Sequence, residues 1–464
     1  MHTPPNTLEA ADAGPRRLRV FGAGVWVFSI LLCLMYMGMM HDFRSAGLTE
    51  AEVVQALLDG AEAVEKDMGG VPVERKAAFA LSGLLAVYCL ATRRRDAVFE
   101  STLLTALIAA FLAVLFASYV WSESRLSTGL ELVRISVYAM LAFGMALRFT
   151  ALEIAKILTL SCTLSVAVAC ATVVAGYSPA QVDGVFRLSG SLHPNVLAKY
   201  ATFVIIGSLG FARIRRGGID WRFVVLAGLM TAALLLTRSR TSLACCVVGV
   251  AAYYALGMTW RQRVVFASLG AVVLGGALVA AGLTGGKLLK DAGQAANMGR
   301  REDAGSLNGR LPLWEKLYEL GDGRYVQGFG YGAFWTEHRR VKLLHALRWA
   351  PGHAHNVVFE TMLHTGLIGA ALVVSIGWTT LLRLGVLGAS PDQPAYRMLF
   401  AMMVTIVASS FTTTTYIMPR EMVVLSGVLV VCAALAPRTE TARAATTRRA
   451  GAASGGWGAT GAMA

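Results

Sequence analysis

The chain has 464 residues, of which 56% are hydrophobic and only 15% are charged. Soluble proteins carry about 25% charged residues, so the composition excludes an ordinary soluble enzyme of this length. The formal net charge is +14, but the arginines cluster in short turns between apolar segments. This pattern is typical of cytoplasmic loops of membrane proteins, and no nucleic-acid partner is expected.

Apolar segments of about 20 residues recur along the chain, and each is long enough to cross a bilayer. We predict an all-α, polytopic membrane protein of about twelve transmembrane helices, forming one domain over residues 1–464. The seven cysteines lie in or beside these segments, so neither a disulfide framework nor a zinc site is expected. The expected spans are residues 20–40, 77–92, 97–121, 128–147, 155–176, 195–212, 221–237, 243–260, 264–284, 356–383, 397–417 and 422–436.

Arginine-rich turns set the expected orientation of the spans, because positively charged loops stay in the cytoplasm. Such turns lie at residues 93–95, 213–216 and 261–263. Both termini are then predicted in the cytoplasm, and a large loop before the last three spans, residues 285–352, is predicted outside it. The Gly- and Ala-rich tail, residues 438–464, is expected to be cytoplasmic and disordered.

The same topology places three polar stretches on the external side: residues 177–194, 238–242 and 285–355. The first contains Arg187 and His193, and leads through Pro194 into a helix that carries Lys199 one turn later. A solvated arginine and a capped helix start explain this stretch as well as a binding site does. Lys199 either extends to the surface or faces a wet cavity.

The second stretch is a very short loop between two apolar spans. Its two arginines, Arg238 and Arg240, run against the tendency of positive charge to stay in the cytoplasm. Guanidinium groups match phosphate oxygens in bidentate geometry, so the loop predicts an anionic ligand. Non-specific contact with lipid headgroups is the alternative.

The third stretch begins near Arg310 and Trp314, continues through the glycine run 328–332 and ends at His353 and His355. The glycine run does not follow a strand pattern, so it indicates a tight turn rather than a dinucleotide site. Histidines two residues apart cannot share a helical face, and no carboxylate or cysteine cluster accompanies them. A metal site is therefore not expected.

His355 precedes an apolar helix on the external side. A histidine in this position can act as a general base near neutral pH, with His353 and Asn356 as supporting residues. The alternative is that His355 only caps the helix.

In their order along the chain, these motifs resemble the O-antigen ligase and polymerase superfamily of polytopic membrane glycosyltransferases. The large loop before the last three spans is also similar. The motifs are Ser239-Arg240-Thr241, Asn308-Gly309-Arg310 with Trp314, and His355-Asn356 followed by Gly366-Leu367-Ile368-Gly369.

The resemblance implies an O-antigen ligase of the bacterial inner membrane, metal-independent, inverting and without a cofactor, with its active site on the periplasmic side. Its donor would be O-antigen linked to undecaprenyl diphosphate, and its acceptor the lipid A–core oligosaccharide of lipopolysaccharide. Membrane lipids would surround it. On this interpretation His355 is the catalytic base. The expected diphosphate ligands are Arg187, Arg238, Arg240 and Arg310, and the expected supporting residues are His353, Asn356, His193 and Lys199.

Three alternatives stay open at this point. An O-antigen polymerase or a protein O-oligosaccharyltransferase would share the His-Asn and arginine motifs. A transporter or flippase belongs to a different class, and it would place ionisable residues near the bilayer midplane, whereas the charges here lie mostly near the ends of the expected spans.

Overall fold

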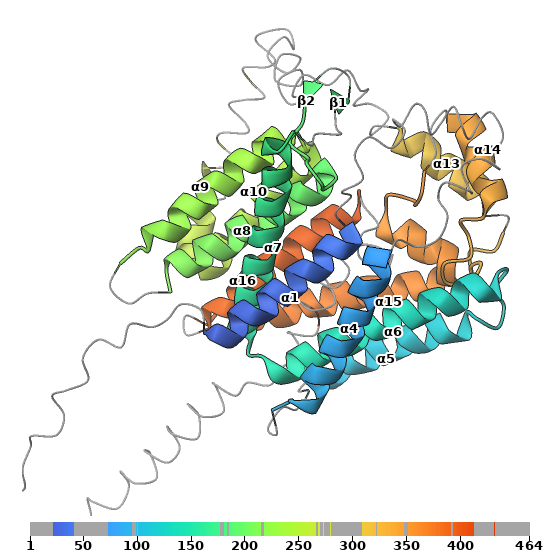
Figure 1. Cartoon of the computed structure of the whole chain (residues 1–464), viewed down its shortest axis with the longest axis horizontal. Coiled ribbons are helices and arrows are strands. Elements are labelled where there is room, and N and C mark those ends of the chain that lie inside the picture. Colours follow the sequence, from blue (N-terminus) through green and yellow to red (C-terminus); the bar gives the residue numbers. More distant parts are fainter. Residues whose placement is uncertain are drawn as a thin grey trace, which may run out of the picture.

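The computed structural model describes residues 22–40, 73–94, 99, 101–176, 181–182, 185–214, 218–265, 268–269, 272, 279, 309–321, 323–347, 351–390, 393–412 and 431. These residues form a bundle of α-helices and one two-stranded antiparallel hairpin, in which β1 (Gln181–Val182) pairs with β2 (Val185–Phe186) (Figure 1). The prediction of an all-α protein is confirmed apart from this short hairpin.

Most described helices belong to the bundle. Five of them, α6, α7, α8, α10 and α15, are long and apolar enough to cross a membrane, which confirms a polytopic membrane protein. A total of twelve spans stays a prediction, because the expected spans 264–284 and 422–436 lie largely outside the described residues, and the tail 438–464 lies wholly outside them. The bundle helices are α1 (Ala23–Met40), α4 (Val73–Ala91), α5 (Thr102–Ala117), α6 (Arg125–Arg148), α7 (Ala151–Val174), α8 (Pro194–Ala212), α9 (Trp221–Leu236), α10 (Arg240–Gly257), α15 (Val357–Gly388) and α16 (Pro394–Ser410).

Helix α8 lies at the centre of the bundle and is buried along nearly its whole length. It packs against α7, α9, α10 and α16, and Tyr200 stacks on Tyr36 of α1 with ring centroids 5.7 Å apart. Its start follows from the sequence: His193 caps it, and Pro194 occupies the first turn, where a missing N–H costs nothing.

One end of the bundle gathers the polar stretches. The amide of Leu188 donates to the carbonyl of Leu236 over 2.9 Å, which joins the first stretch to the end of α9. Nδ2 of Asn356 donates to the carbonyl of Phe411 over 3.4 Å, which joins the third stretch to the end of α16. We call this the polar end; it comprises the described residues within 185–195, 236–242 and 309–356.

The described residues of the arginine-rich turns lie at the opposite end, because α6, α8 and α10 run away from the polar end. Arg148, the last residue of α6, donates to the carbonyl of Thr92 over 3.0 Å. The guanidinium of Arg213, just after α8, lies 4.7 Å from the ring centre of Tyr254. The length of the bundle thus separates the two sets of loops. Which end faces the cytoplasm stays a prediction.

The long polar segment contributes two helices that the sequence analysis did not predict, α13 (Arg310–Leu320) and α14 (Glu337–Leu347). Figure 1 shows them together outside the bundle. Leu313, Leu317 and Leu343 form a small core there with Phe329 and Phe334. The described part of the segment, within residues 309–347, therefore packs around an apolar core.

Helix α15 is broken at Gly366, whose φ of 72° and ψ of −170° interrupt the helix. The glycine run 328–332 lies against the break. The amide of Phe329 donates to the carbonyl of Leu363 over 2.8 Å, and that of Gly330 to the carbonyl of His364 over 2.9 Å. These bonds supply donors to two carbonyl groups that lack an intrahelical donor because of the break. The glycine run thus supports the start of α15.

Candidate active site

Asn356 is the cap of α15. Its Oδ1 accepts hydrogen bonds from the amides of Val358 (2.9 Å) and Phe359 (3.1 Å), which is the usual arrangement at a helix start. The alternative that His355 only caps this helix is therefore wrong. The supporting role of Asn356 in the site and the catalytic role of His355 stay predictions.

The backbone of His355 is left-handed, with φ of 52°. Among the described residues, only Arg238 shares this conformation without being glycine. A side chain with a Cβ rarely adopts it, and such strained residues gather at functional sites. Both belong to the motifs that the sequence analysis singled out.

The two histidines of the loop lie against each other. The amide of His355 donates to Nδ1 of His353 over 3.3 Å, and the ring centroids are 4.0 Å apart. Because Nδ1 of His353 accepts this bond, the neutral ring of His353 carries its proton on Nε2. His353 thus contacts the backbone of the loop, and its supporting role in the site stays a prediction.

The ring of His355 lies in a cationic environment drawn from three separate segments. The pKa of His355 is lowered from 6.5 to about 2, chiefly by burial of the ring and then by electrostatic effects of His353, Arg310, Lys199 and His193, in that order. The ring is therefore neutral at pH 7 and keeps a lone pair that can accept a proton. Four of the predicted site residues thus act electrostatically on the predicted base.

Lys199 and His193 reach this environment from the first turns of α8. The side chain of Lys199 is buried, so of the two alternatives the structure favours an inward-facing lysine. Nδ1 of His193 accepts a hydrogen bond from the amide of Asn195 over 3.2 Å, so His193 combines its place near His355 with the role of helix cap.

Arg187 links the start of α8 to the turn between α9 and α10. Its Nε donates to the carbonyl of Thr237 over 3.1 Å, and its Nη2 to Oδ1 of Asn195 over 3.3 Å. These bonds use part of the guanidinium for protein contacts, so a diphosphate-binding role for Arg187 stays a prediction. The half-buried Arg238 and Arg240 follow Thr237 directly, which puts their backbone beside the start of α8.

Sequence reasoning missed Glu360, which is fully buried in the first turn of α15. Its Oε2 accepts the amide of Ala354 over 2.6 Å, and its Oε1 accepts Nε1 of Trp335 over 2.7 Å. Nε2 of His364 lies 3.3 Å from the same Oε1. One signal was present in the sequence: a lone carboxylate in an apolar segment, four residues after Asn356.

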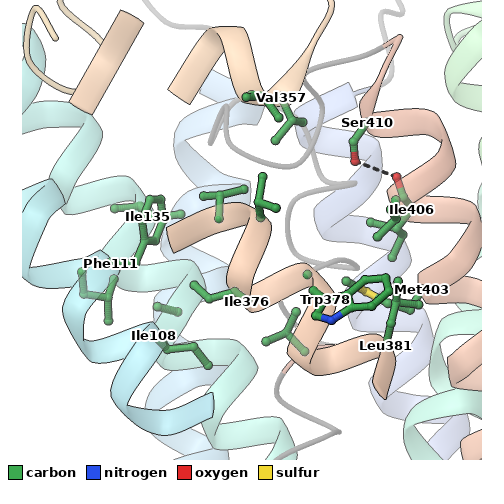
Figure 2. Close-up of a pocket in the computed structure, with 18 of the residues that line it drawn as sticks. Ile108, Phe111, Ile135, Val357, Ile376, Trp378, Leu381, Met403, Ile406 and Ser410 are labelled. Atoms are coloured by element: carbon green, nitrogen blue, oxygen red, sulfur yellow. Dashed lines mark hydrogen bonds between the residues drawn. The ribbon is translucent and has the colours of Figure 1, made fainter. Parts of the chain in front are cut away.

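An apolar cavity of about 490 Å³ begins next to the His355–Asn356 loop. It lies between α5, α6, α15 and α16. Figure 2 shows Val357 at one end of the cavity and Ile108 and Leu381 towards the other. Phe411, whose carbonyl accepts from Asn356, is also part of the lining. A hydrocarbon chain in this cavity would have its end beside the loop that carries His355.

The described residues thus form an integral membrane protein of apolar helices, with a histidine in a cationic cluster at one end and an apolar cavity beside it. They contain no group of three or more His, Cys, Asp and Glu side chains that could hold a metal ion.

Residues 225–374 of this chain match the family model described as O-antigen ligase, which confirms the family resemblance. The matched range includes Arg238, Arg240, Arg310, His355 and Glu360. It begins after the segment with Arg187, His193 and Lys199, which therefore lies outside the match. A comparison with proteins of curated function found no match.

Proposed function

We propose that the protein is an O-antigen ligase, which transfers a polysaccharide from undecaprenyl diphosphate to lipid A–core oligosaccharide on the periplasmic side of the bacterial inner membrane. The observation that carries the proposal is the neutral ring of His355 among Lys199, Arg310 and neighbouring histidines. A base beside a cluster of cations suits a reaction in which a hydroxyl loses a proton while an anionic group departs.

The proposed step is a single displacement at the anomeric carbon of the donor sugar. The acceptor hydroxyl oxygen bonds to this carbon as the bond from the carbon to the diphosphate oxygen breaks. The hydroxyl proton passes to the ring of His355, and the electron pair of the broken bond leaves with the diphosphate. Attack opposite the leaving group inverts the configuration, as expected for this family.

The cations have two roles in this scheme. Arg238, Arg240, Arg310 and Lys199 stabilise the negative charge that develops on the leaving diphosphate, a task that a metal ion performs in many other transferases. The bound diphosphate also places negative charge beside the cluster, which raises the pKa of His355. The ring is then a stronger base when the donor is present than when it is absent.

The apolar cavity supports a lipid-linked donor. Its lining is almost wholly apolar, and its end at Val357 and Val358 adjoins Asn356 and so the proposed base. An isoprenoid chain in the cavity would leave its diphosphate at the polar end of the bundle. Burial of such a chain contributes about 0.8 kcal/mol per methylene group.

A transporter is the less favoured alternative. The buried charged residues Glu131, Lys199 and Glu360 each lie within the first two turns of a helix, whereas transporters concentrate ionisable groups near the bilayer midplane. A polymerase or a protein O-oligosaccharyltransferase would use the same base and cations, and would differ only in the acceptor.

The experiment is transfer in vitro by the purified protein in detergent, with one defined glycan on undecaprenyl diphosphate as donor. Three acceptors are compared: rough lipopolysaccharide, a second molecule of the donor, and an unfolded protein rich in serine. We expect transfer to rough lipopolysaccharide alone, unchanged by EDTA and absent in His355→Ala. Chain extension of the donor would identify a polymerase, modified protein an oligosaccharyltransferase, and no product with any acceptor would overturn glycosyl transfer.

A further inference from the structure

We infer that Glu360 is a positioning residue for the proposed reaction: it holds the backbone of Ala354 and thereby keeps His355 in its left-handed conformation. The inference rests on the proposed role of His355 as the base. Glu360 itself is fully buried, so it acts on the reaction through the loop and not by touching the substrate.

Both carboxylate oxygens of Glu360 are used for this purpose. Oε2 accepts from the amide of Ala354 over 2.6 Å, and Oε1 accepts from Nε1 of Trp335 over 2.7 Å. An ionised carboxylate can accept with both oxygens, whereas a glutamine offers only one acceptor and two donor hydrogens. Glutamine at this position would therefore lose one of the two hydrogen bonds, and its NH₂ group would face the N–H group of either Ala354 or Trp335.

Ala354 is also held from its other side. Its carbonyl accepts a hydrogen bond from Nε1 of Trp314 over 2.8 Å, and the ring of Trp314 stacks on Phe359 with centroids 5.7 Å apart and an angle of 9° between the planes. Phe359 directly precedes Glu360 in α15. The two polar backbone groups of Ala354 are thus both fixed by side chains, and we call this arrangement the Ala354 clamp.

The clamp acts at the residue where the loop needs support. Ala354 stands between the two histidines and is fully buried. The next residue, His355, has the unfavourable φ of 52°, which persists only where surrounding contacts impose it. Without the clamp, the loop can relax to ordinary backbone angles, and the ring of His355 then leaves its place among Arg310 and Lys199.

This role has a kinetic signature. A base that is misplaced by about 1 Å costs roughly 10²-fold in rate, whereas the cations that bind the diphosphate are unchanged. We therefore expect Glu360→Gln to lower kcat by roughly 10²-fold and to leave KM for donor and acceptor unchanged, the pattern of an interaction made only in the transition state. The matched control is Glu319→Gln, because Glu319 is exposed on α13 and pairs with Lys316; its kinetics should equal those of the unmodified protein.

The test measures transfer from the lipid-linked donor to rough lipopolysaccharide for Glu360→Gln, His355→Ala and the double variant. Because Glu360 acts through His355, we expect the double variant to keep the residual rate of His355→Ala. If the double variant were slower than His355→Ala by the full factor that Glu360→Gln causes alone, the two residues would act independently. That result would overturn the inference about Glu360 and leave the proposed role of His355 intact. A wild-type rate for His355→Ala would instead overturn the proposed base.

A second variant keeps the test decisive if Glu360→Gln does not fold. Trp314→Phe preserves the stack on Phe359 and the partners of Glu360, and removes only the hydrogen bond to the carbonyl of Ala354. We expect a lower kcat with unchanged KM here too, and no further loss when Trp314→Phe is combined with His355→Ala. An unchanged kcat for Trp314→Phe would overturn the Ala354 clamp.

Discussion

His355 and Asn356 are adjacent but have separate tasks. Oδ1 of Asn356 accepts the first amides of α15, while the left-handed backbone of His355 carries its ring into the field of Arg310 and Lys199. Because the cap belongs to the neighbour, the side chain at position 355 can change without removing the hydrogen bonds that start the helix. Catalytic and structural effects can therefore be measured separately.

Replacing His355 should remove the base and leave the fold. We expect His355→Ala and His355→Asn to reduce transfer by about 10²–10⁴-fold, the usual contribution of a general base. Asparagine is the sharper variant because it tolerates left-handed backbone angles and cannot take a proton at neutral pH. Turnover and thermal unfolding in detergent are measured together, with the exposed His338→Ala as the control. Near-normal turnover of His355→Asn would exclude the base assignment.

The pH dependence of transfer should reflect the depressed pKa of His355. With its pKa lowered to about 2, the ring of the free protein stays neutral as the pH falls, so protonation of His355 should not reduce kcat/KM between about pH 8 and pH 5. Bound diphosphate raises the pKa, so the acid limb of kcat should lie at a higher pH than that of kcat/KM. The pH profile of kcat/KM is measured for the unmodified protein and for His353→Ala and His193→Ala, because the histidines at these positions also affect His355 electrostatically. A fall of kcat/KM with a midpoint near pH 6.5 that persists in both variants would contradict the depressed pKa of His355.

Arg240 should bind the donor diphosphate through its guanidinium fork. Hydrogen bonds to charged groups contribute about 1.5–3 kcal/mol, so Arg240→Ala should lower kcat/KM for the donor by roughly 10–100-fold. Arg240→Lys should recover little of this, because lysine loses the bidentate geometry. The control is Arg261→Ala, an exposed arginine beyond the far end of α10. Wild-type kcat/KM in Arg240→Ala at sub-saturating donor would remove this residue from the diphosphate site.

The sequence was sufficient for the bundle and for much of the cluster around His355. Long apolar segments have few stable alternatives to helices in a bilayer, and alternating helix directions bring every second loop to the same end. This reasoning linked Lys199, Arg310 and His355, although they are far apart in the chain.

The supporting contacts could not be predicted in the same way. Glu360 lies 25 residues from Trp335, and only the folded loop shows that they share a hydrogen bond with consequences for Ala354. A glycine inside a helix is commonly tolerated, so Gly366 alone did not indicate a break. The helices α13 and α14 were missed because the segment is polar overall, and its small apolar core is dispersed along the sequence.

Gly366 should be indispensable for the stability of the polar end. A Cβ at this position would stand 1.9 Å from the carbonyl oxygen of Val326, and φ of 72° with ψ of −170° is almost restricted to glycine. We expect Gly366→Ala to lower the thermal midpoint clearly, since backbone strain alone costs on the order of 1–3 kcal/mol. Gly377→Ala is the matched control on the same helix, because its Cβ would meet only Val407, at 3.9 Å. Equal midpoints for the two variants would contradict the break.

The orientation of the bundle follows from its two sets of loops. Arginine-rich turns lie at one end, and the proposed site lies at the other, so the positive-inside rule predicts the polar end in the periplasm. Single cysteines are introduced at the exposed positions Glu319 on α13 and Arg93 after α4, with the parent chain as background for the native cysteines. In spheroplasts, an impermeant maleimide should label Glu319→Cys at once and Arg93→Cys only after the membrane is permeabilised. The reverse pattern would place the polar end in the cytoplasm, where no periplasmic acceptor could reach His355.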